Sequence, residues 1–127
     1  MKVTICDTDL NSRIQLYSRL NKKYNIDKEN VKISCCQPND IIFDIDDGKF
    51  DSDILITEVL FQNMQYNGVD LVKRVNEKNP MCKVIYYVQK IPVNMDIYES
   101  RHENCILKGL QEDRLEKCVS NILNQVT

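Results

Sequence analysis

The sequence predicts an α/β fold in which five parallel strands form one sheet with helices on both faces. Apolar, β-branched runs alternate with segments of helical periodicity five times along the 127 residues. The run from Asp53 to Thr57 is apolar on both faces, as in a central strand with a helix layer on each side. These observations predict a (βα)5 order, a three-layer sandwich around a five-stranded parallel sheet.

The first strand is predicted at residues 2–6 and ends at the polar residues 7–9. Apolar residues at helical spacing follow and predict the first helix: Leu10, Ile14, Tyr17 and Tyr24. The second strand is predicted at residues 31–36. A short helix follows it, because Pro38 suits the first turn of a helix and Gly48 suits its end.

The third strand, at residues 53–57, ends at the charged Glu58. The next helix is predicted from its apolar residues Val69, Leu71, Val72 and Val75. A fourth strand follows at residues 84–88. Residues 92–100 give the weakest pattern, and the fivefold order places a helix there. After a fifth strand at residues 105–107, the final helix is predicted from an apolar stripe: Leu110, Leu115, Cys118, Val119, Ile122 and Leu123.

The composition bounds the class of protein. A chain of this length with 43% hydrophobic residues forms one domain, residues 1–127, around one core. A net charge of -2 and a pI near 5.4 give no basic field, so we expect no direct contact with nucleic acid. The longest apolar run is far shorter than the roughly 20 residues of a membrane span, and there is no signal-peptide segment. We therefore expect no membrane contact and a cytoplasmic location.

Six cysteines are present without an export signal or a CxxC spacing, which favours reduced thiols over disulfides or zinc ligands. Most of them lie in apolar runs, so we expect small buried side chains. Cys35 and Cys36 could form a redox pair, but neighbours on a strand point to opposite faces.

His102 lies in a polar segment and is expected on the exposed surface. The acidic residues 44–53 lack the spacing of a calcium loop and are expected to be solvated.

Polar side chains follow three of the predicted strands. Asp7, Thr8 and Asp9 follow the first strand, Glu58 the third and Lys108 the fifth. The carboxyl ends of parallel strands share one edge of the sheet, which is where such folds hold their functional groups. Carboxylates from two loops facing one lysine suit phosphoryl or divalent-cation chemistry.

The chain resembles the receiver domains of bacterial response regulators, especially those preceding LytTR-type DNA-binding domains, over essentially its whole length. Four segments in the family's order carry the resemblance: MKVTICDTD, GKFDSDILITEV, NGVDLVKRVNEKNPMCKVIYYV and CILKGL. The resemblance implies a flavodoxin-like fold. It also implies that an aspartate at the position of Glu58 accepts a phosphoryl group from a histidine kinase. An acidic pair and the acceptor then hold Mg2+, while the lysine and a Ser or Thr after the fourth strand contact the phosphoryl oxygens.

Three of these five positions depart from the family. Asp7 and Lys108 match it, whereas Thr8 replaces the second acid, Glu58 the acceptor and Val88 the Ser or Thr. Glutamate places its charge one methylene further from the backbone, which spoils the in-line geometry at Mg2+. Val88 cannot donate a hydrogen bond. The metal ligands Asp7 and Glu58 are therefore expected to bind Mg2+ weakly or not at all, and we expect no other cofactor.

Two interpretations of Glu58 remain open. In the first, Glu58 forms a permanent pair with Lys108 that imitates the phosphorylated state. In the second, the site has decayed, and a solvated Glu58 contributes roughly 0 to 1 kcal/mol with its lysine. The loop at residues 59–67 is two residues longer than the family's and lacks its proline, and Cys105 stands where the family often has a switching aromatic.

These residues favour a receiver-like signalling module that is not an enzyme and acts without phosphorylation. It would regulate a partner or a DNA-binding domain attached C-terminally outside this chain. The alternative is a receiver that accepts a phosphoryl group from a histidine kinase with Mg2+. The family's dimer surface corresponds to residues 92–125, where we expect a protein partner or a second copy. A flavodoxin-like enzyme or nucleotide binder has no support, because no glycine-rich phosphate loop is present.

Overall fold

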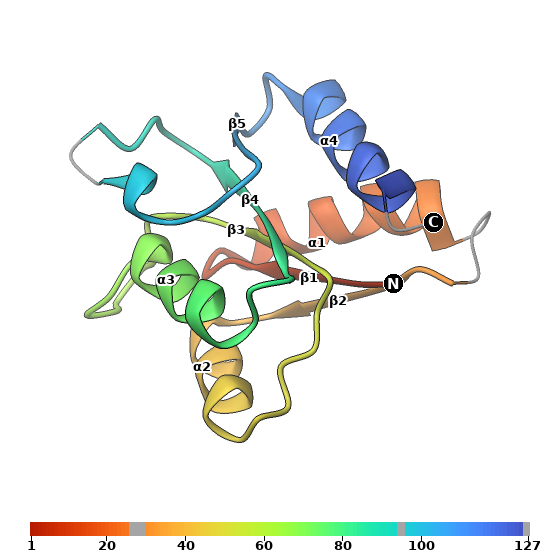
Figure 1. Cartoon of the computed structure of the whole chain (residues 1–127). Helices are drawn as coiled ribbons and strands as arrows, with labels where there is room; N and C mark the ends of the chain where they lie inside the picture. Colours follow the sequence, from red (N-terminus) through yellow and green to blue (C-terminus); the bar gives the residue numbers. More distant parts are fainter. Residues whose placement is uncertain (26–29, 94–95, 126–127) are drawn as a thin grey trace.

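The computed structural model describes residues 1–25, 30–93 and 96–125 and has the predicted five-stranded parallel sheet (Figure 1). The strands lie in the order β2-β1-β3-β4-β5, and every neighbouring pair is parallel. The strand bounds are β1 Lys2–Cys6, β2 Lys32–Cys36, β3 Ile54–Thr57, β4 Lys83–Val88 and β5 Asn104–Leu107. The chain reverses its direction across the sheet between β1 and β3, where open α/β sheets place their sites.

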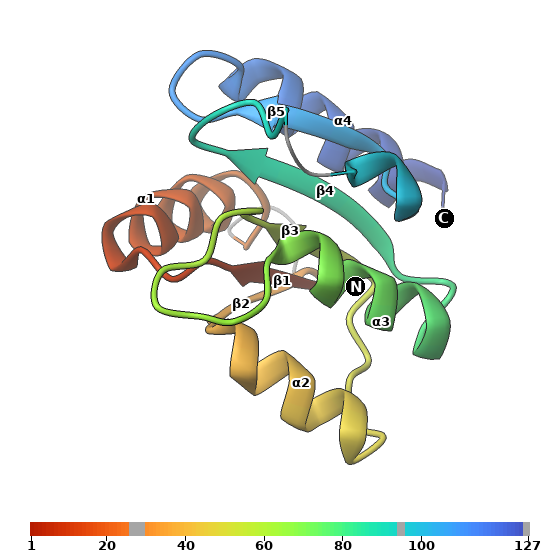
Figure 2. The same ribbon diagram turned by 90° about the vertical axis from the view of Figure 1, so that its left-hand side faces the viewer.

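Helices cover both faces of this sheet (Figure 2). The helix bounds are α1 Leu10–Leu20, α2 Pro38–Asp46, α3 Gly68–Lys78 and α4 Glu112–Gln125. On one face α1 and α4 bury Leu16 and Val119, and on the other α2 and α3 bury Ile41 and Leu71. The predicted three-layer α/β fold is confirmed. No helix in the described ranges is long and apolar enough to cross a membrane.

The predicted helix α1 is present, but most of the apolar residues that predict it do not face the sheet. Three of these four residues are 37% to 57% exposed: Leu10, Ile14 and Tyr17. Leu16 and Leu20 face the sheet instead, and Tyr24 joins them from the π-helical turn Asn21–Asn25, which follows α1. The segment carries two apolar stripes at helical spacing, and the one that continues into Tyr24 covers the sheet. An apolar strip is left on the outer face of α1.

The (βα)5 order also predicts an α-helix between β4 and β5, and the described residues of that segment contain none. They hold only the 3-10 helix η2, Ile97–Glu99. Residues 94–95 of the predicted helix lie outside the described residues. Pro92 has no backbone N–H to donate to a helical hydrogen bond. The Ser100 hydroxyl donates to the Ile97 carbonyl at 2.7 Å, which ends the 3-10 helix after three residues.

Leu110 and most of the cysteines are more exposed than the sequence predicts. Leu110 precedes α4 and is 81% exposed, so it does not belong to the apolar stripe of that helix. Most of the cysteines are not buried, because only Cys6 and Cys82 are. The other four are half-buried or exposed: Cys35, Cys36, Cys105 and Cys118. All six are free cysteines in the structure. Cys35 and Cys36 lie on an edge strand, which has a neighbour on one side only.

Tyr86 and Tyr87 lie on opposite faces of β4, as the alternation of a buried strand predicts. Tyr86 is fully buried, and its hydroxyl lies 2.6 Å from the Ser100 hydroxyl. Burial raises the pKa of Tyr86 to about 12. The ring of His102 lies 4.9 Å from the Tyr86 ring, so His102 is half-buried rather than exposed. The phenol thus connects β4 to the segment that replaces the missing helix.

Replacing Tyr86 with phenylalanine is expected to lower the free energy of unfolding by about 1 kcal/mol, because a buried hydrogen bond is lost while Ser100 keeps its bond to Ile97. Urea denaturation measures the difference. Tyr98→Phe is the matched control, because Tyr98 is 87% exposed and should change stability by less than about 0.5 kcal/mol. Equal stabilities for the two variants would contradict the role given to the Tyr86 hydroxyl.

Candidate functional site

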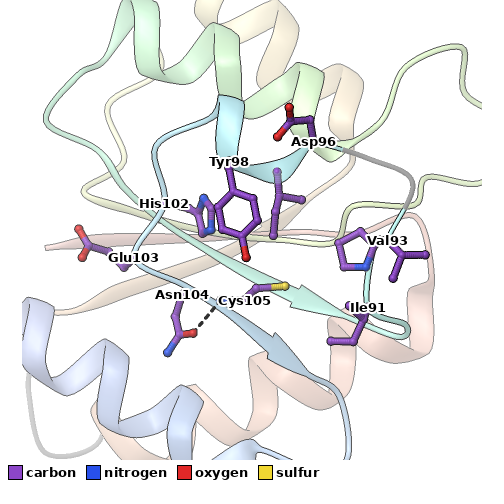
Figure 3. A pocket seen from close by; sticks show the side chains of 10 residues that line it. Ile91, Val93, Asp96, Tyr98, His102, Glu103, Asn104 and Cys105 are labelled. Atoms are coloured by element: carbon purple, nitrogen blue, oxygen red, sulfur yellow. Dashed lines mark hydrogen bonds between the residues drawn. The ribbon is translucent and has the colours of Figure 1, made fainter.

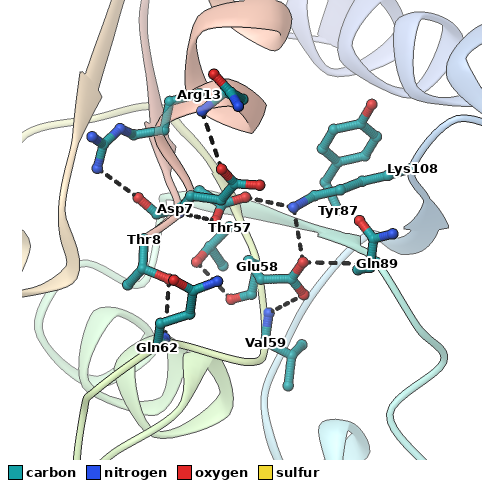
Figure 4. Close-up of polar contacts among 12 residues, drawn as sticks. Asp7, Thr8, Arg13, Thr57, Glu58, Val59, Gln62, Tyr87, Gln89 and Lys108 are labelled. Carbon is teal, nitrogen blue, oxygen red and sulfur yellow. Dashed lines mark hydrogen bonds and ion pairs between the residues drawn. The ribbon is translucent and has the colours of Figure 1, made fainter.

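Asp7, Glu58 and Lys108 meet at the carboxyl edge of the sheet (Figure 4). They follow β1, β3 and β5 directly, so the sheet itself positions them. The Lys108 Nζ atom lies 2.5 Å from Asp7 Oδ2 and 2.9 Å from Glu58 Oε2. The three side chains are between 6% and 11% exposed. The carboxylate of Glu58 therefore forms an ion pair with Lys108 and is not a solvated strand-end group.

Two backbone amides complete the surroundings of the Glu58 carboxylate. Its Oε1 atom accepts a hydrogen bond from the Val59 N–H at 2.8 Å, and its Oε2 atom accepts one from the Gln89 N–H at 3.0 Å. With Lys108, three donors from the ends of three strands hold one carboxylate. Hydrogen bonds to an ionised group are about twice as strong as neutral ones. The sequence carries no signal for the two amides, because any non-proline residue supplies an N–H.

Asp7 is held equally firmly. Its Oδ1 atom accepts from the Asp9 N–H at 2.9 Å, while Oδ2 contacts Lys108. The backbone carbonyl of Asp7 accepts from Arg13 Nη1 at 2.8 Å, a contact for which the sequence carries no signal. Arg13 belongs to α1, so the start of that helix is fastened to the site.

The site holds two carboxylates and one ammonium in a largely buried space. Burial alone would lower the pKa of Lys108, but hydrogen bonds and charge attraction from Asp7 and Glu58 outweigh it and raise that pKa above its ordinary value. Lys108 therefore stays protonated at neutral pH, and it neutralises only one of the two carboxylates.

The other predicted residues lie around this triad without joining it. The Thr8 hydroxyl accepts from the Gln62 N–H at 3.0 Å, so it fastens the loop after β3 to the loop after β1. Asp9 is exposed and caps α1 by accepting from the Asn11 N–H at 3.1 Å. Val88 is fully buried in the core on the α3 side. Asp9 and Val88 were predicted in the pocket, and neither side chain hydrogen-bonds to Glu58 or Lys108.

The long loop at residues 59–67 is fastened at its other end as well. The Tyr66 hydroxyl donates to Asn39 Oδ1 of α2 at 2.6 Å, and the Phe61 and Tyr66 rings meet edge to face with centroids 6.0 Å apart. Asn63 adopts the left-handed conformation with φ 58°, a region that asparagine tolerates better than most residues. The loop at residues 59–67 is thus held by hydrogen bonds to Thr8 and to Asn39 of α2.

The donor set around the site does not suit Mg2+. Both oxygens of Asp7 and both of Glu58 already accept hydrogen bonds from N–H or ammonium groups. A cation at these oxygens would lie close to the ammonium of Lys108, and like charges repel at this distance. Within the part of the chain that the structure describes, no group of three or more His, Cys, Asp or Glu side chains is placed to hold a metal ion.

A hollow lies beside η2 and β5 (Figure 3), and no residue of the charged triad lines it. Its walls include Ile91, Val93, Tyr98, His102 and Cys105. Val93 and Tyr98 are 81% and 87% exposed. All of these wall residues except Ile91 lie within residues 92–125, the range in which the sequence places a partner.

No family model matches this sequence, and no curated protein matches it either. Solved structures do match in fold. One is the N-terminal domain of a response regulator/sensory box/GGDEF protein from Carboxydothermus hydrogenoformans, with TM-score 0.80, 13% identity and coverage of 99% of this chain and 96% of that one. Another is the response regulator TrrA of Thermotoga maritima in complex with Mg2+ and BeF, with TM-score 0.76, 15% identity and coverage of 95% and 97%.

A third match is the response regulator RcsB in a complex with DNA, with TM-score 0.76, 18% identity and coverage of 97% of this chain but 62% of RcsB. At these identities the likeness concerns the fold alone. The chain therefore has the fold of response regulator receiver domains, with the charged triad at the edge of the sheet described above.

Proposed function

We propose that this domain is a receiver-like signalling module that works without phosphorylation, with the carboxylate of Glu58 taking the place of a phosphoryl group. The observation that carries the proposal is the set of three donors around Glu58: the N–H groups of Val59 and Gln89 and the ammonium of Lys108. A phosphoryl group on a shorter acidic side chain would require the same kind of donors. Glutamate reaches them with its own charge.

The proposal includes the absence of Mg2+ and of catalysis. Mg2+ demands nearly octahedral oxygen ligands and usually combines carboxylates with substrate phosphate. In this domain Thr8 supplies no charge, and the carboxylates of Asp7 and Glu58 are engaged with Lys108. The side chain of Val88 offers no donor to a phosphoryl oxygen. The site holds loops in place and performs no chemistry.

The output of such a module is contact with another protein segment. The exposed apolar residues within 92–125, among them Val93 and Tyr98, suit a protein partner or a second copy in the cytoplasm; residues 94–95 of this range lie outside the described structure. RcsB is a response regulator seen bound to DNA, and this chain covers 62% of it. By analogy, we assign the regulated target to a DNA-binding domain, such as one of the LytTR type, attached to this domain or carried by a partner.

The proposal predicts that the chain gains no mass on incubation with acetyl phosphate and Mg2+. The expected result follows from Glu58, whose carboxylate oxygens already accept hydrogen bonds and lie one methylene too far out for in-line attack on the phosphorus of acetyl phosphate. Intact-mass spectrometry reads the outcome directly. A receiver domain with an acceptor aspartate, placed in the same tube, controls for the activity of the reagent.

Covalent addition of one phosphoryl group to the native chain would support the alternative, a receiver competent in phosphotransfer. The variant Glu58→Gln identifies the acceptor in that case, since addition that disappears in this variant must have occurred on Glu58. Addition that persists in it would locate the acceptor elsewhere in the chain.

A further inference from the structure

The two edge strands of the sheet differ in whether their outward backbone N–H groups have hydrogen-bond partners. β2 and β5 are the edges, so each has one row of N–H and C=O groups that no strand of the described residues pairs. Such rows are templates for pairing with another chain, and proteins usually block them. The amide donors of β5 are blocked, and those of β2 are not.

On β5 the amides of Cys105 and Leu107 point away from β4. The Cys105 N–H donates to the side-chain oxygen of Asn104 at 2.8 Å, and the Leu107 N–H donates to the side-chain oxygen of Gln111 at 2.9 Å. Two amide side chains of the same molecule therefore satisfy the outward donors of this edge, and a second strand would have to displace them.

On β2 the outward groups belong to Ile33 and Cys35. The Lys32 N–H donates to the Met1 carbonyl at 2.8 Å, so Lys32 faces β1, and the alternation of a strand turns Ile33 and Cys35 outward. No acceptor among the described residues meets either N–H. The strand contains no proline or bulge, and its one charge, Lys32, lies at its start.

Exposed apolar side chains stand beside this open edge. A groove next to Cys35 is lined by Leu10, Ile14 and Tyr17 of α1, the strip that the sheet leaves uncovered. On α2, which covers the other face of the sheet, Phe43 is 66% exposed. A surface with apolar side chains and unpaired backbone groups is typical of an interaction site, and a strand that adds to an edge uses both.

We propose that β2 pairs antiparallel with β2 of a second copy of this chain, so that one continuous sheet crosses both molecules. With a two-fold axis at Ser34, the outward N–H and C=O groups of the two β2 strands face each other. Ile33 then exchanges both backbone hydrogen bonds with Cys35 of the second copy, and Cys35 does the same with Ile33. Lys32 opposes Cys36 of the second copy, which keeps the two lysines at opposite ends of the joint, and the α1 strips of the two copies pack together.

This interface is separate from residues 92–125, so it stands or fails independently of the proposed function. Sedimentation equilibrium of the whole chain over a wide range of protein concentration tests it. The native chain and Cys35→Ser, which keeps the backbone donor, should form dimers. Cys35→Pro removes the outward N–H without touching the bonds to β1, since proline is tolerated on edge strands, and should weaken dimerisation at least about tenfold.

Ile14→Glu provides a second variant, because Ile14 is 53% exposed and its replacement leaves the core of the chain intact. It should also yield monomers, and circular dichroism should show both variants folded. A native chain that stays monomeric at every concentration overturns the proposal. So does a dimer that survives both Cys35→Pro and Ile14→Glu, or one that is lost instead in Tyr98→Ser on the opposite edge.

Discussion

Lys108→Met should lower the free energy of unfolding by about 3 to 5 kcal/mol, the typical cost of leaving a buried charge without its partner. Methionine fills a similar volume, but Asp7 and Glu58 would then face each other as two buried carboxylates without a cation. Urea denaturation at neutral pH measures the loss. Lys83→Met is the matched control, because Lys83 and its partner Glu103 are 45% and 40% exposed and their pair is worth about 0 to 1 kcal/mol.

The pH dependence of stability provides a second measurement on the same variant. The pKa of Lys108 is raised in the folded chain, so its stabilisation is fully present below the ordinary lysine pKa of about 10.4 and disappears as the pH rises through the folded value. The native chain should therefore lose more stability in this alkaline range than Lys108→Met does. A cost below about 1 kcal/mol at neutral pH, or parallel alkaline profiles, would show that the triad does not hold the sheet edge together.

The sequence predicts the triad because its three residues directly follow strands that are easy to recognise. β1, β3 and β5 are short apolar runs, and parallel strands bring their carboxyl ends to one edge regardless of the intervening chain. The predicted fold therefore brings Asp7, Glu58 and Lys108 to one edge of the sheet, and the long Lys108 side chain reaches past the end of β4 to contact the other two. The length of the Glu58 side chain then determines which donors it reaches.

The remaining contacts of the site could not be predicted from residue types. The donors Val59 and Gln89 act through their backbone N–H groups, and their positions depend on where β3 and β4 end. The Thr8 contact with Gln62 likewise depends on the path of the long loop. Hydrogen bonds of this kind follow from three-dimensional arrangement, because the sequence identifies only side chains.

The features of the fold that the sequence does not predict correctly have the same origin. The residues of α1 offer two apolar stripes, and periodicity alone does not indicate which one covers the sheet. Only the packing of Leu16 and Leu20 against the strands decides it. The fivefold repeat, in turn, favoured a helix between β4 and β5, whereas the contacts of Tyr86 with Ser100 hold that segment as a single 3-10 turn. Tertiary contacts override local preference at both places.

The second large effect is expected from Gly68→Ala at the start of α3. A Cβ atom at Gly68 would lie 2.1 Å from the Glu58 carbonyl oxygen and 2.8 Å from the Val59 Cα atom, and both are backbone atoms that cannot rotate away. The Gly68 N–H also donates to the Val59 carbonyl at 2.7 Å, so the two segments cannot separate without losing that bond. We expect a loss of about 3 kcal/mol in urea denaturation, at the upper end of the usual cost of overpacking.

Gly48→Ala distinguishes this clash from the general effect of removing a glycine. Gly48 has φ 69° and open space around it, so alanine there should cost only the left-handed strain of about 1 to 2 kcal/mol.

The two variants should also differ at the site, because the clash at Gly68 displaces the backbone that carries Glu58 and its donor Val59. Amide chemical shifts of Val59 and Gln89 should move in Gly68→Ala and stay in place in Gly48→Ala. Unmoved shifts with a loss no greater than that of Gly48→Ala would mean that α3 and the strand end carrying Glu58 are not coupled through this contact.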